Sequence, residues 1–391
     1  KQVAICYVCG ETCDVFSFVQ NKEKISFPEA VEKVCQIINF DDPRLHQYTG
    51  NNNFVINDDM QNLYDCINDL QKFYEYALTT QEGEAGRKYL ESRQLSQEQI
   101  KKFGIGYAFE DGRKTIDFIH NQKGYSLKSI QNIGIALNKG EDTADSNAGR
   151  VIFPIKNAAG QVCGFSARAL GKVEDGRKYV NTPQTKIFEK NNILYNLHRA
   201  KNTCKFDGYI YVLEGFMDVI ALDAIGIESA VAVMGKELTE NQLKQLKRLG
   251  VEIRLCLDND AAGQTAMMKN VPILSEEGIN YRVVSKPTEQ MKDTDDILKK
   301  EGEQSLKDYV NSLVEPFDFV MNYCKYYSPL KRDDSKQRVI NQFAPMLSKI
   351  KDELTLENYL YKLEEVTGYK VEVIKNYLKN QKEKILVEDT N

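Results

Sequence analysis

The chain has 391 residues, of which 42% are apolar and 28% charged, and its formal net charge is −5 at pH 7. This length exceeds the roughly 250–300 residues at which a single hydrophobic core usually divides, so two or three domains are expected. There is no apolar run of about 18 residues and no segment like a signal peptide, which excludes a membrane-spanning protein and favours a cytoplasmic one with no membrane partner.

The first candidate site is the pair Cys6-Tyr-Val-Cys9, which is half of a tetrahedral zinc site. The other cysteines are mostly scattered among apolar residues, which favours a reducing cytoplasm over a disulfide framework. His46 lies too far along the chain to be an obvious ligand. Because the first residue is Lys1 and not Met, a preceding segment is expected to supply two further ligands. Without it, ordinary reduced thiols are the alternative.

Helical patterns and a linker follow. Residues 14–38 predict two helical pieces, with Ser26 as an N-cap and Pro28 in the first turn. The Asn- and Asp-rich stretch 39–59 is typical of a linker and marks a domain boundary. Residues 60–82 predict an amphipathic helix, because apolar residues recur at helical spacing. These are Leu63, Ile67, Leu70, Tyr74 and Ala77.

Charge separates the middle of the chain into two parts. Residues 86–206, here called the basic segment, carry 21 Lys and Arg against 11 Asp and Glu. Residues 207–302 carry 11 Lys and Arg against 17 Asp and Glu. This change indicates a phosphate-binding surface that faces a metal-binding carboxylate cluster, and solvated helix faces are the alternative. Within the basic segment, the strand-like runs 151–155 and 162–165 predict a hairpin.

The acidic part predicts a parallel sheet. Four strand-like runs, 209–213, 229–234, 252–257 and 281–285, alternate with helical stretches at about 217–225, 239–249 and 261–270. After Pro316 the pattern is almost entirely helical. The expected fold is therefore α/β, with an α+β subdomain before the parallel sheet and an α-helical subdomain after it.

Acidic residues follow the predicted strands at the edge where open α/β sheets carry their chemistry. Glu214 follows the first strand, with Asp218 four residues later; Asp258 and Asp260 follow the third; Asp293, Asp295 and Asp296 follow the fourth. Converging carboxylates need a cation, and Mg²⁺ or Mn²⁺ suits oxygen ligands. Structural or solvated carboxylates are the alternative.

Three of these stretches resemble the motifs of the Toprim domain as it occurs in bacterial replicative DNA primases of the DnaG type. They are LEGFMDVIAL at 213–222, LDNDAAG at 257–263 and KDTDDIL at 292–298. Toprim domains also occur in topoisomerases and nucleases, so they do not define the activity alone. Stretches of the basic segment resemble the primase polymerase domain in the same order. They are YLESRQLS at 89–96, FGIGY at 103–107, GRVIFPI at 149–155, GFSAR at 164–168, KYVNTP at 178–183, IFEK at 187–190 and LYNL at 194–197.

The resemblance implies a domain order. Residues 1–40 would be a remnant of the zinc-binding domain, 41–59 a linker, 60–206 the basic N-terminal subdomain of the polymerase domain, 207–302 the Toprim catalytic subdomain and 303–391 a helical C-terminal subdomain. Asn259 stands where Gly is common, Thr294 where Pro is, and Cys13 where Gly is expected. Cys13 and the absent first pair of ligands weaken the prediction of zinc binding, whereas Asn259 and Thr294 leave the predicted carboxylates unchanged. A helicase-binding domain is expected to lie beyond residue 391.

The implied activity is synthesis of short RNA primers from ribonucleoside triphosphates on single-stranded DNA, by two-metal phosphoryl transfer. Catalytic roles fall to Glu214, Asp258 and Asp260, and the metal ligands would be these three with Asp218, Asp293 and Asp295. Nucleotide and template phosphates would be bound by Arg93, Arg150, Arg168, Lys178 and Lys190. The expected partners are the template, the replicative helicase and the single-strand DNA-binding protein. A Toprim nuclease or topoisomerase and a non-catalytic DNA-binding relative remain alternatives.

Overall fold

The computed structural model describes residues 3–5, 12–23, 25, 30–31, 33–34, 58–139, 142–171, 177–285, 293–327 and 333–388, which form two compact units, Lys1–Leu63 and Tyr64–Asn391. In the smaller unit, β1 (Val3–Ile5) pairs antiparallel with β2 (Thr12–Asp14), and α1 (Val15–Glu23) follows. Helix α1 confirms the first predicted helical piece. Cys6, Cys9, Ser26 and Pro28 lie outside the described residues.

The predicted amphipathic helix is confirmed as α4 (Asp58–Thr79), and its predicted apolar positions are all buried. Helices α5 (Glu84–Ser92) and α6 (Gln97–Phe103) follow it. Ser96 begins α6 with a capping box, because its hydroxyl accepts from the Gln99 amide at 3.1 Å and its own amide donates to the Gln99 side chain at 3.2 Å. The turn between α5 and α6 is therefore fixed by local hydrogen bonds.

The basic segment forms an antiparallel sheet in the order β3-β6-β7-β8. Its strands are β3 (Gly106–Tyr107), β6 (Arg150–Lys156), β7 (Val162–Ala169) and β8 (Tyr179–Asn181). The predicted hairpin is the β6–β7 connection, where Gly160 adopts φ +88°. A second, two-stranded hairpin is made by β4 (Ala136–Lys139) and β5 (Asp142–Asp145). Helices α7 (Gly112–Ile116) and α8 (Leu127–Asn132) lie on either side of a π-helical stretch, Asp117–Gln122.

The predicted parallel sheet is confirmed, with strand order β10-β9-β11-β12-β13. The strands are β9 (Tyr209–Leu213), β10 (Ala230–Ala232), β11 (Glu252–Cys256), β12 (Tyr281–Val284) and the antiparallel edge strand β13 (Leu313–Val314). Six helices accompany them: α9 (Leu197–Asp207), α10 (Phe216–Ala224), α11 (Glu240–Leu249), α12 (Ala261–Glu276), α13 (Thr294–Glu301) and α14 (Glu303–Val310).

Alternating side chains of this sheet enter two different cores. Ile210, Val212 and Leu255 pack with residues of α9, α11 and α12, whereas Tyr211 and Leu213 pack with residues of α10, α13 and α14. Both faces are thus covered, as parallel sheets require. Helix α9 packs against β9 and β10, although nearly all of its residues belong to the basic segment.

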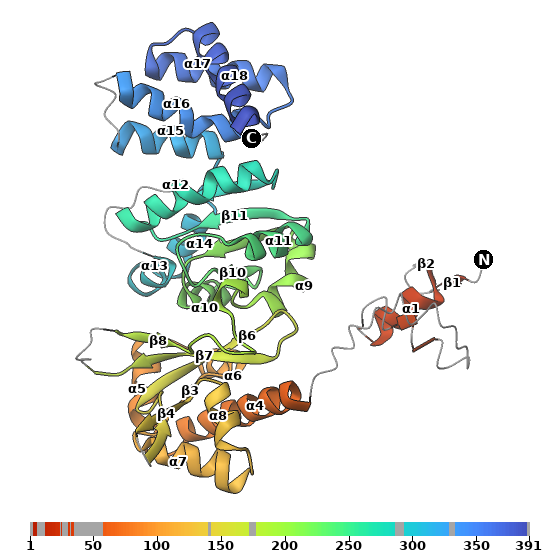
Figure 1. Ribbon diagram of the computed structural model, residues 1–391, viewed down its shortest axis with the longest axis vertical. Helices are drawn as coiled ribbons and strands as arrows, with labels where there is room; N and C mark the ends of the chain where they lie inside the picture. The colour runs from red at the N-terminus through yellow and green to blue at the C-terminus, as the bar shows by residue number, and fades with distance from the viewer. Residues whose placement is uncertain are drawn as a thin grey trace. The chain divides into compact units, whose positions relative to one another are not determined.

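The helical pattern after Pro316 is confirmed by α15 (Pro316–Tyr327), α16 (Asp333–Leu347), α17 (Glu353–Thr367) and α18 (Val371–Glu388). Phe317 of α15 stacks on Tyr359 of α17 with ring centroids 4.0 Å apart, and α16 packs on α12. In the larger unit, the parallel sheet lies between these helices and the antiparallel sheet (Figure 1). None of the helices in the described ranges is long and apolar enough to cross a membrane.

One acidic side chain is buried in the basic segment without a cation beside it in the described contacts. Asp145 of β5 is 3% exposed; it accepts from the Tyr74 hydroxyl at 2.7 Å and from the Asn147 amide at 2.8 Å. Burial raises its pKa to about 6, and these hydrogen bonds only partly oppose the effect. Asp145 thus ties α4 to the β4–β5 hairpin at an electrostatic cost.

This burial predicts a pH dependence of stability. Because the pKa of Asp145 is higher in the folded chain than its ordinary 3.8, the folded chain keeps a proton that the unfolded chain loses. The free energy of unfolding should therefore fall as pH rises from about 4 to about 6, by on the order of 2–3 kcal/mol from this group. Chemical denaturation across this range should show a fall that is larger in the parent than in Asp145→Asn by about this amount, because other groups such as Asp218 titrate alike in both.

The control is Asp111→Asn. Asp111 is an exposed N-cap whose pKa is lowered by hydrogen bonds from the Arg113 amide and side chain, so its contribution to stability has the opposite pH dependence. Equal pH profiles for the parent and Asp145→Asn would contradict the assignment.

A candidate metal centre at the carboxyl edge of the parallel sheet

Neighbouring central strands carry the first two acidic motifs. Strands β9 and β11 are paired in parallel with Leu213 opposite Cys256, so Glu214 and Asp258 leave the same edge of the sheet from adjacent strands. The Glu214 carbonyl accepts from the Met234 amide at 3.0 Å, which joins the end of β9 to the residues after β10. The strand order therefore places two predicted ligands side by side.

The first and third motifs are joined by a buried hydrogen bond. Asp218, in the first turn of α10, is 7% exposed and accepts from the Thr294 hydroxyl at 2.7 Å. Its other oxygen accepts from the Gly215 amide at 3.2 Å. Asp293 caps α13 by accepting from the Asp296 amide at 2.8 Å. Thr294, which stands where the resembling family has Pro, thus uses its hydroxyl to link the starts of α10 and α13.

The acids of the three motifs lie within electrostatic reach of one another. Burial raises the pKa of Asp218 to about 8, and the charges of Asp293, Asp258 and Asp295 raise it as well. Carboxylate oxygens of Asp293, Asp295 and Asp296 all lie within 4.8 Å of one another. A donor set made of carboxylates that repel one another fits a hard divalent cation, which would remove the repulsion.

The second motif depends on a close backbone approach. Asp260 caps α12, accepting from the amides of Ala262 and Gly263 at 3.0 and 2.9 Å. A Cβ at Gly263 would lie 2.0 Å from the Asp258 carbonyl oxygen, so only glycine allows this turn. Asp258 and Asp260 are both half-buried. The glycine is needed to place both acids after β11.

Asp295, another predicted ligand, contacts two cations. It is 6% exposed and bonds to the guanidinium of Arg93 and to the ammonium of Lys299, the latter at 2.5 Å. The sequence interpretation missed Lys299, although its position four residues after Asp295 on a helix was a usable signal. Arg93, predicted to bind phosphate, contacts the acidic cluster directly through Asp295.

Arg168 lies between two tyrosine rings. Its guanidinium carbon is 5.4 Å from the ring centroid of Tyr89 and 5.2 Å from that of Tyr179. Tyr179 in turn meets Phe216 of α10 edge-on, with centroids 5.5 Å apart. These aromatic contacts connect the antiparallel sheet to the helix of the first motif. Both tyrosines stand in stretches that carry the family resemblance, but the sequence interpretation gave them no role.

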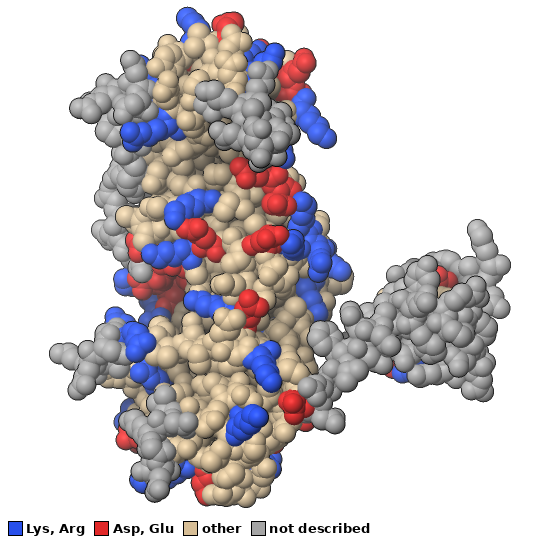
Figure 2. Space-filling view, in the orientation of Figure 1, with Lys and Arg blue, Asp and Glu red and all other residues tan. Residues whose placement is uncertain are grey.

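The other predicted phosphate-binding residues lie apart from these contacts. Lys178 and Lys190 are exposed, and Arg150 is half-buried at the start of β6. Among the described contacts, none joins these three side chains to the carboxylates. On the face drawn in Figure 2, basic and acidic side chains alternate over the middle of the larger unit, so the charge change along the sequence does not appear there as two separate surfaces.

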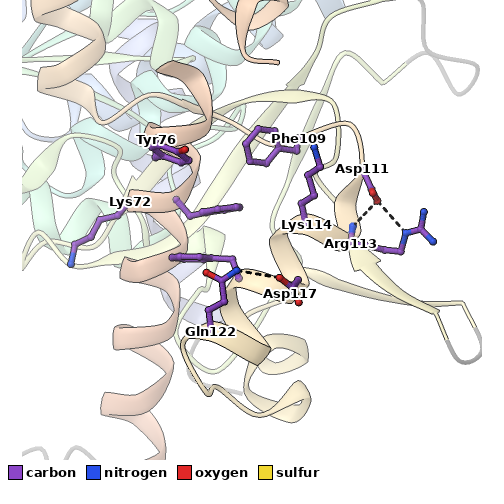
Figure 3. A pocket seen from close by; sticks show the side chains of 10 residues that line it. Lys72, Tyr76, Phe109, Asp111, Arg113, Lys114, Asp117 and Gln122 are labelled. Atoms are coloured by element: carbon purple, nitrogen blue, oxygen red, sulfur yellow. Dashed lines mark hydrogen bonds and ion pairs between the residues drawn. The ribbon is translucent and has the colours of Figure 1, made fainter. Parts of the chain in front are cut away.

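A cavity of about 680 Å³ between α4 and the basic segment is lined by aromatic and charged side chains (Figure 3). Phe73 of α4 stacks on Phe118 with centroids 4.2 Å apart, beside Phe109 and the exposed Tyr76. The predicted site residues are not among those that line it. The candidate metal centre is therefore a separate place in the fold.

Comparison with known proteins finds matches to primases and their domains. Four family models match, described as CHC2 zinc finger (residues 1–50), DNA primase catalytic core, N-terminal domain (73–201), Toprim-like (211–298) and DnaB-helicase binding domain of primase (317–371). A DNA primase of Staphylococcus aureus is 31% identical over 380 residues, which cover 91% of this chain and 62% of the relative. The chain thus spans less than two thirds of that protein's length.

Solved structures agree with this fold. The zinc-binding and RNA polymerase domains of the Aquifex aeolicus primase match with a TM-score of 0.68 and 24% identity, over 95% of this chain and 86% of that one. A DnaG primase catalytic domain bound to single-stranded DNA matches with a TM-score of 0.66 and 29% identity, over 79% of this chain and 97% of that one. The families that these domains represent bind zinc and divalent metal.

One expectation is corrected. The helicase-binding region was expected beyond residue 391, but the matching family model covers 317–371, within the chain. Not all apolar side chains of this matched region are buried. In α17, Leu354 and Tyr361 are 81% and 62% exposed, so part of this apolar surface faces outward.

The repulsion among the acids predicts a stabilising substitution. Asp258→Asn removes one charge beside Asp218, so without divalent cations the melting temperature should hold or rise, by about 1–3 °C at most. Added Mn²⁺ should raise the melting temperature of the parent and not that of the variant. Asp308→Asn, an exposed change on α14, is the control and should respond to Mn²⁺ like the parent. An undiminished Mn²⁺ response of Asp258→Asn would contradict the metal assignment.

Proposed function

We propose that the chain is a DNA primase of the DnaG type, which synthesises short RNA primers from ribonucleoside triphosphates on a single-stranded DNA template. The observation that carries the proposal is the carboxylate cluster at the edge of a Toprim-like sheet, adjoining a basic segment that matches the primase catalytic core. The proposed domain order is that of the sequence, with the zinc-binding region first and the helical region last.

The proposed metal ligands are Glu214, Asp218, Asp258, Asp260, Asp293 and Asp295, with Glu214, Asp258 and Asp260 in the catalytic role. Mg²⁺ or Mn²⁺ held there would neutralise phosphate charge and lower the pKa of the primer 3′-hydroxyl. The protein's own part is to fix the carboxylates in position. Asp260 is held by the start of α12, and Asp218 by Thr294 and Gly215. Rigid placement of this kind supports in-line attack on the triphosphate.

We place the template and the incoming nucleotide on the basic segment. Arg168, whose guanidinium lies beside the rings of Tyr89 and Tyr179, is proposed to bind a phosphate through its guanidinium N–H groups. Lys178 and Lys190 are exposed and Arg150 is half-buried, and all three are proposed as further phosphate contacts. The related catalytic domain bound to single-stranded DNA supports this assignment.

Further partners belong to the same proposal. Cys6 and Cys9 would be two of four zinc ligands, which zinc analysis of a longer chain would test. The replicative helicase would contact the matched region 317–371 through the exposed Leu354 and Tyr361, and the single-strand DNA-binding protein would share the template. Cytoplasmic location is supported by free, buried cysteines, which are Cys66, Cys163, Cys204, Cys256 and Cys324.

The first test is template-directed ribonucleotide incorporation with Mg²⁺ or Mn²⁺. Asp258→Asn and Glu214→Gln should each lower primer synthesis at least about 100-fold, because each removes a carboxylate from the metal site. Thermal melts of the same samples check that the variants are folded, and Asp308→Asn again serves as the control. Near-normal synthesis by both variants would contradict the proposal, and DNA cleavage instead of synthesis would favour a nuclease or topoisomerase.

The second test concerns DNA binding. Arg168→Ala should weaken binding to a single-stranded oligonucleotide about 3–10-fold, because a side chain that binds phosphate is removed. The slope of log affinity against log salt should become shallower by about 0.7 for each phosphate that is no longer neutralised. Lys244→Ala, in an exposed pair with Glu240 on α11, should leave both quantities unchanged. Parental affinity and slope for Arg168→Ala would show that this side chain does not contact DNA.

A further inference from the structure

Arg93 and Asp295 join two parts of the chain that are distant in sequence. Arg93 is the C-cap of α5 in the basic segment, and Asp295 lies in the first turn of α13, 202 residues later. The Arg93 guanidinium donates to one carboxylate oxygen of Asp295, and Lys299 donates to the same oxygen at 2.5 Å. The buried carboxylate of Asp295 therefore binds one cation from the basic segment, Arg93, and one from its own helix, Lys299.

This contact is not an ordinary surface ion pair. The side chains of Asp295, Lys299 and Arg93 are 8%, 14% and 30% exposed. Breaking such a pair leaves a buried charge uncompensated, so it is expected to persist in solution. The Arg93 Nε is fully buried and makes no hydrogen bond among the described residues. A guanidinium held in this way is poorly placed to follow the phosphates of a moving template.

The same helix supports the Arg168 site. Tyr89 lies one turn before Arg93 on α5 and covers one face of the Arg168 guanidinium. Fixing α5 against α13 therefore also fixes Arg168 relative to the acids of the third motif. The charges of Asp295 and Asp293 outweigh burial and raise the pKa of Arg93, so the cation stays charged.

We propose that Arg93, Asp295 and Lys299 form an ionic latch that holds the Arg168 site at a set distance from the metal-binding carboxylates. This inference rests on the proposed function, and it makes Arg93 a positioning residue and not a phosphate ligand. Asp295, proposed above as a metal ligand, also accepts from both cations, and these cations offset part of the negative charge of Asp293.

A second ion pair provides a matched control. Lys102 of α6 bonds to Asp223 of α10 at 2.6 Å, and their side chains are 30% and 9% exposed, nearly the values of Arg93 and Asp295. This pair also joins the basic segment to the part that carries the parallel sheet, but it has no described contact with the carboxylate cluster. Its removal should cost stability without disturbing the distance between Arg168 and the acids.

The experiment is a double-mutant cycle with Arg93→Gln, Asp295→Asn and their combination, beside the cycle of Lys102→Gln and Asp223→Asn. Each latch variant should lower kcat for primer synthesis at least about 10-fold, and the double variant should be no worse than the poorer single one. Affinity for single-stranded DNA and its salt slope should stay within about twofold of the parent. Arg93→Lys keeps the positive charge but lacks the planar guanidinium, so its kcat should lie between those of Arg93→Gln and the parent.

Hydrogen exchange of the full chain gives a readout that does not require activity. Amides at the end of α5 and the start of α13 should become less protected in Arg93→Gln and stay protected in Lys102→Gln. If the parent makes no primers, hydrogen exchange and a double-mutant cycle measured on melting temperatures still test the latch. Failure of the proposed function can therefore be distinguished from failure of the latch. Reduced DNA affinity with a lower salt slope in Arg93→Gln alone would make Arg93 a phosphate ligand. Additive effects, or equal decreases of kcat in the Lys102 cycle, would also overturn the latch.

Discussion

Mutual repulsion among carboxylates at one edge of the parallel sheet is the constraint on which the surrounding structure depends. Burial and the nearby charges of Asp293, Asp258 and Asp295 raise the pKa of Asp218 to about 8, so ionisation of this group is unfavourable. A fold selected for stability alone would not gather these groups. Their presence is understandable if the site binds divalent cations, because a bound cation neutralises the carboxylates and removes their mutual repulsion.

Several local devices keep the acids in place despite this repulsion. Asp260 and Asp293 are each the N-cap of a helix, where backbone amides and the helix dipole stabilise a carboxylate. Asp218 receives the Thr294 hydroxyl, and Asp295 receives two cations. The cations connect the site to the basic segment, so the interaction that reduces the repulsion also orients the surface proposed to bind the template.

Much of this arrangement could be predicted from the sequence because it is encoded within short stretches. Alternating strand and helix patterns predicted the parallel sheet, and an acid directly after a strand can only lie at the carboxyl edge. Helical spacing predicted α4, and the segment charges identified the basic part. Even the capping roles of Asp260 and Asp293 follow from residues two or three positions away. Local hydrogen bonding and periodic burial leave such signals in any single sequence.

Only the tertiary structure decided which distant groups meet. The sequence does not state that β11 inserts between β9 and β12, and that order makes Glu214 and Asp258 neighbours. It also placed Arg93 among the phosphate ligands, whereas the fold carries it to Asp295, and it left Tyr89 and Tyr179 without a role beside Arg168. Contacts across 76 or 202 residues depend on how sheets and helices pack. No local periodicity records that packing, because each side chain's own neighbours in sequence are the same whichever partner it finally meets.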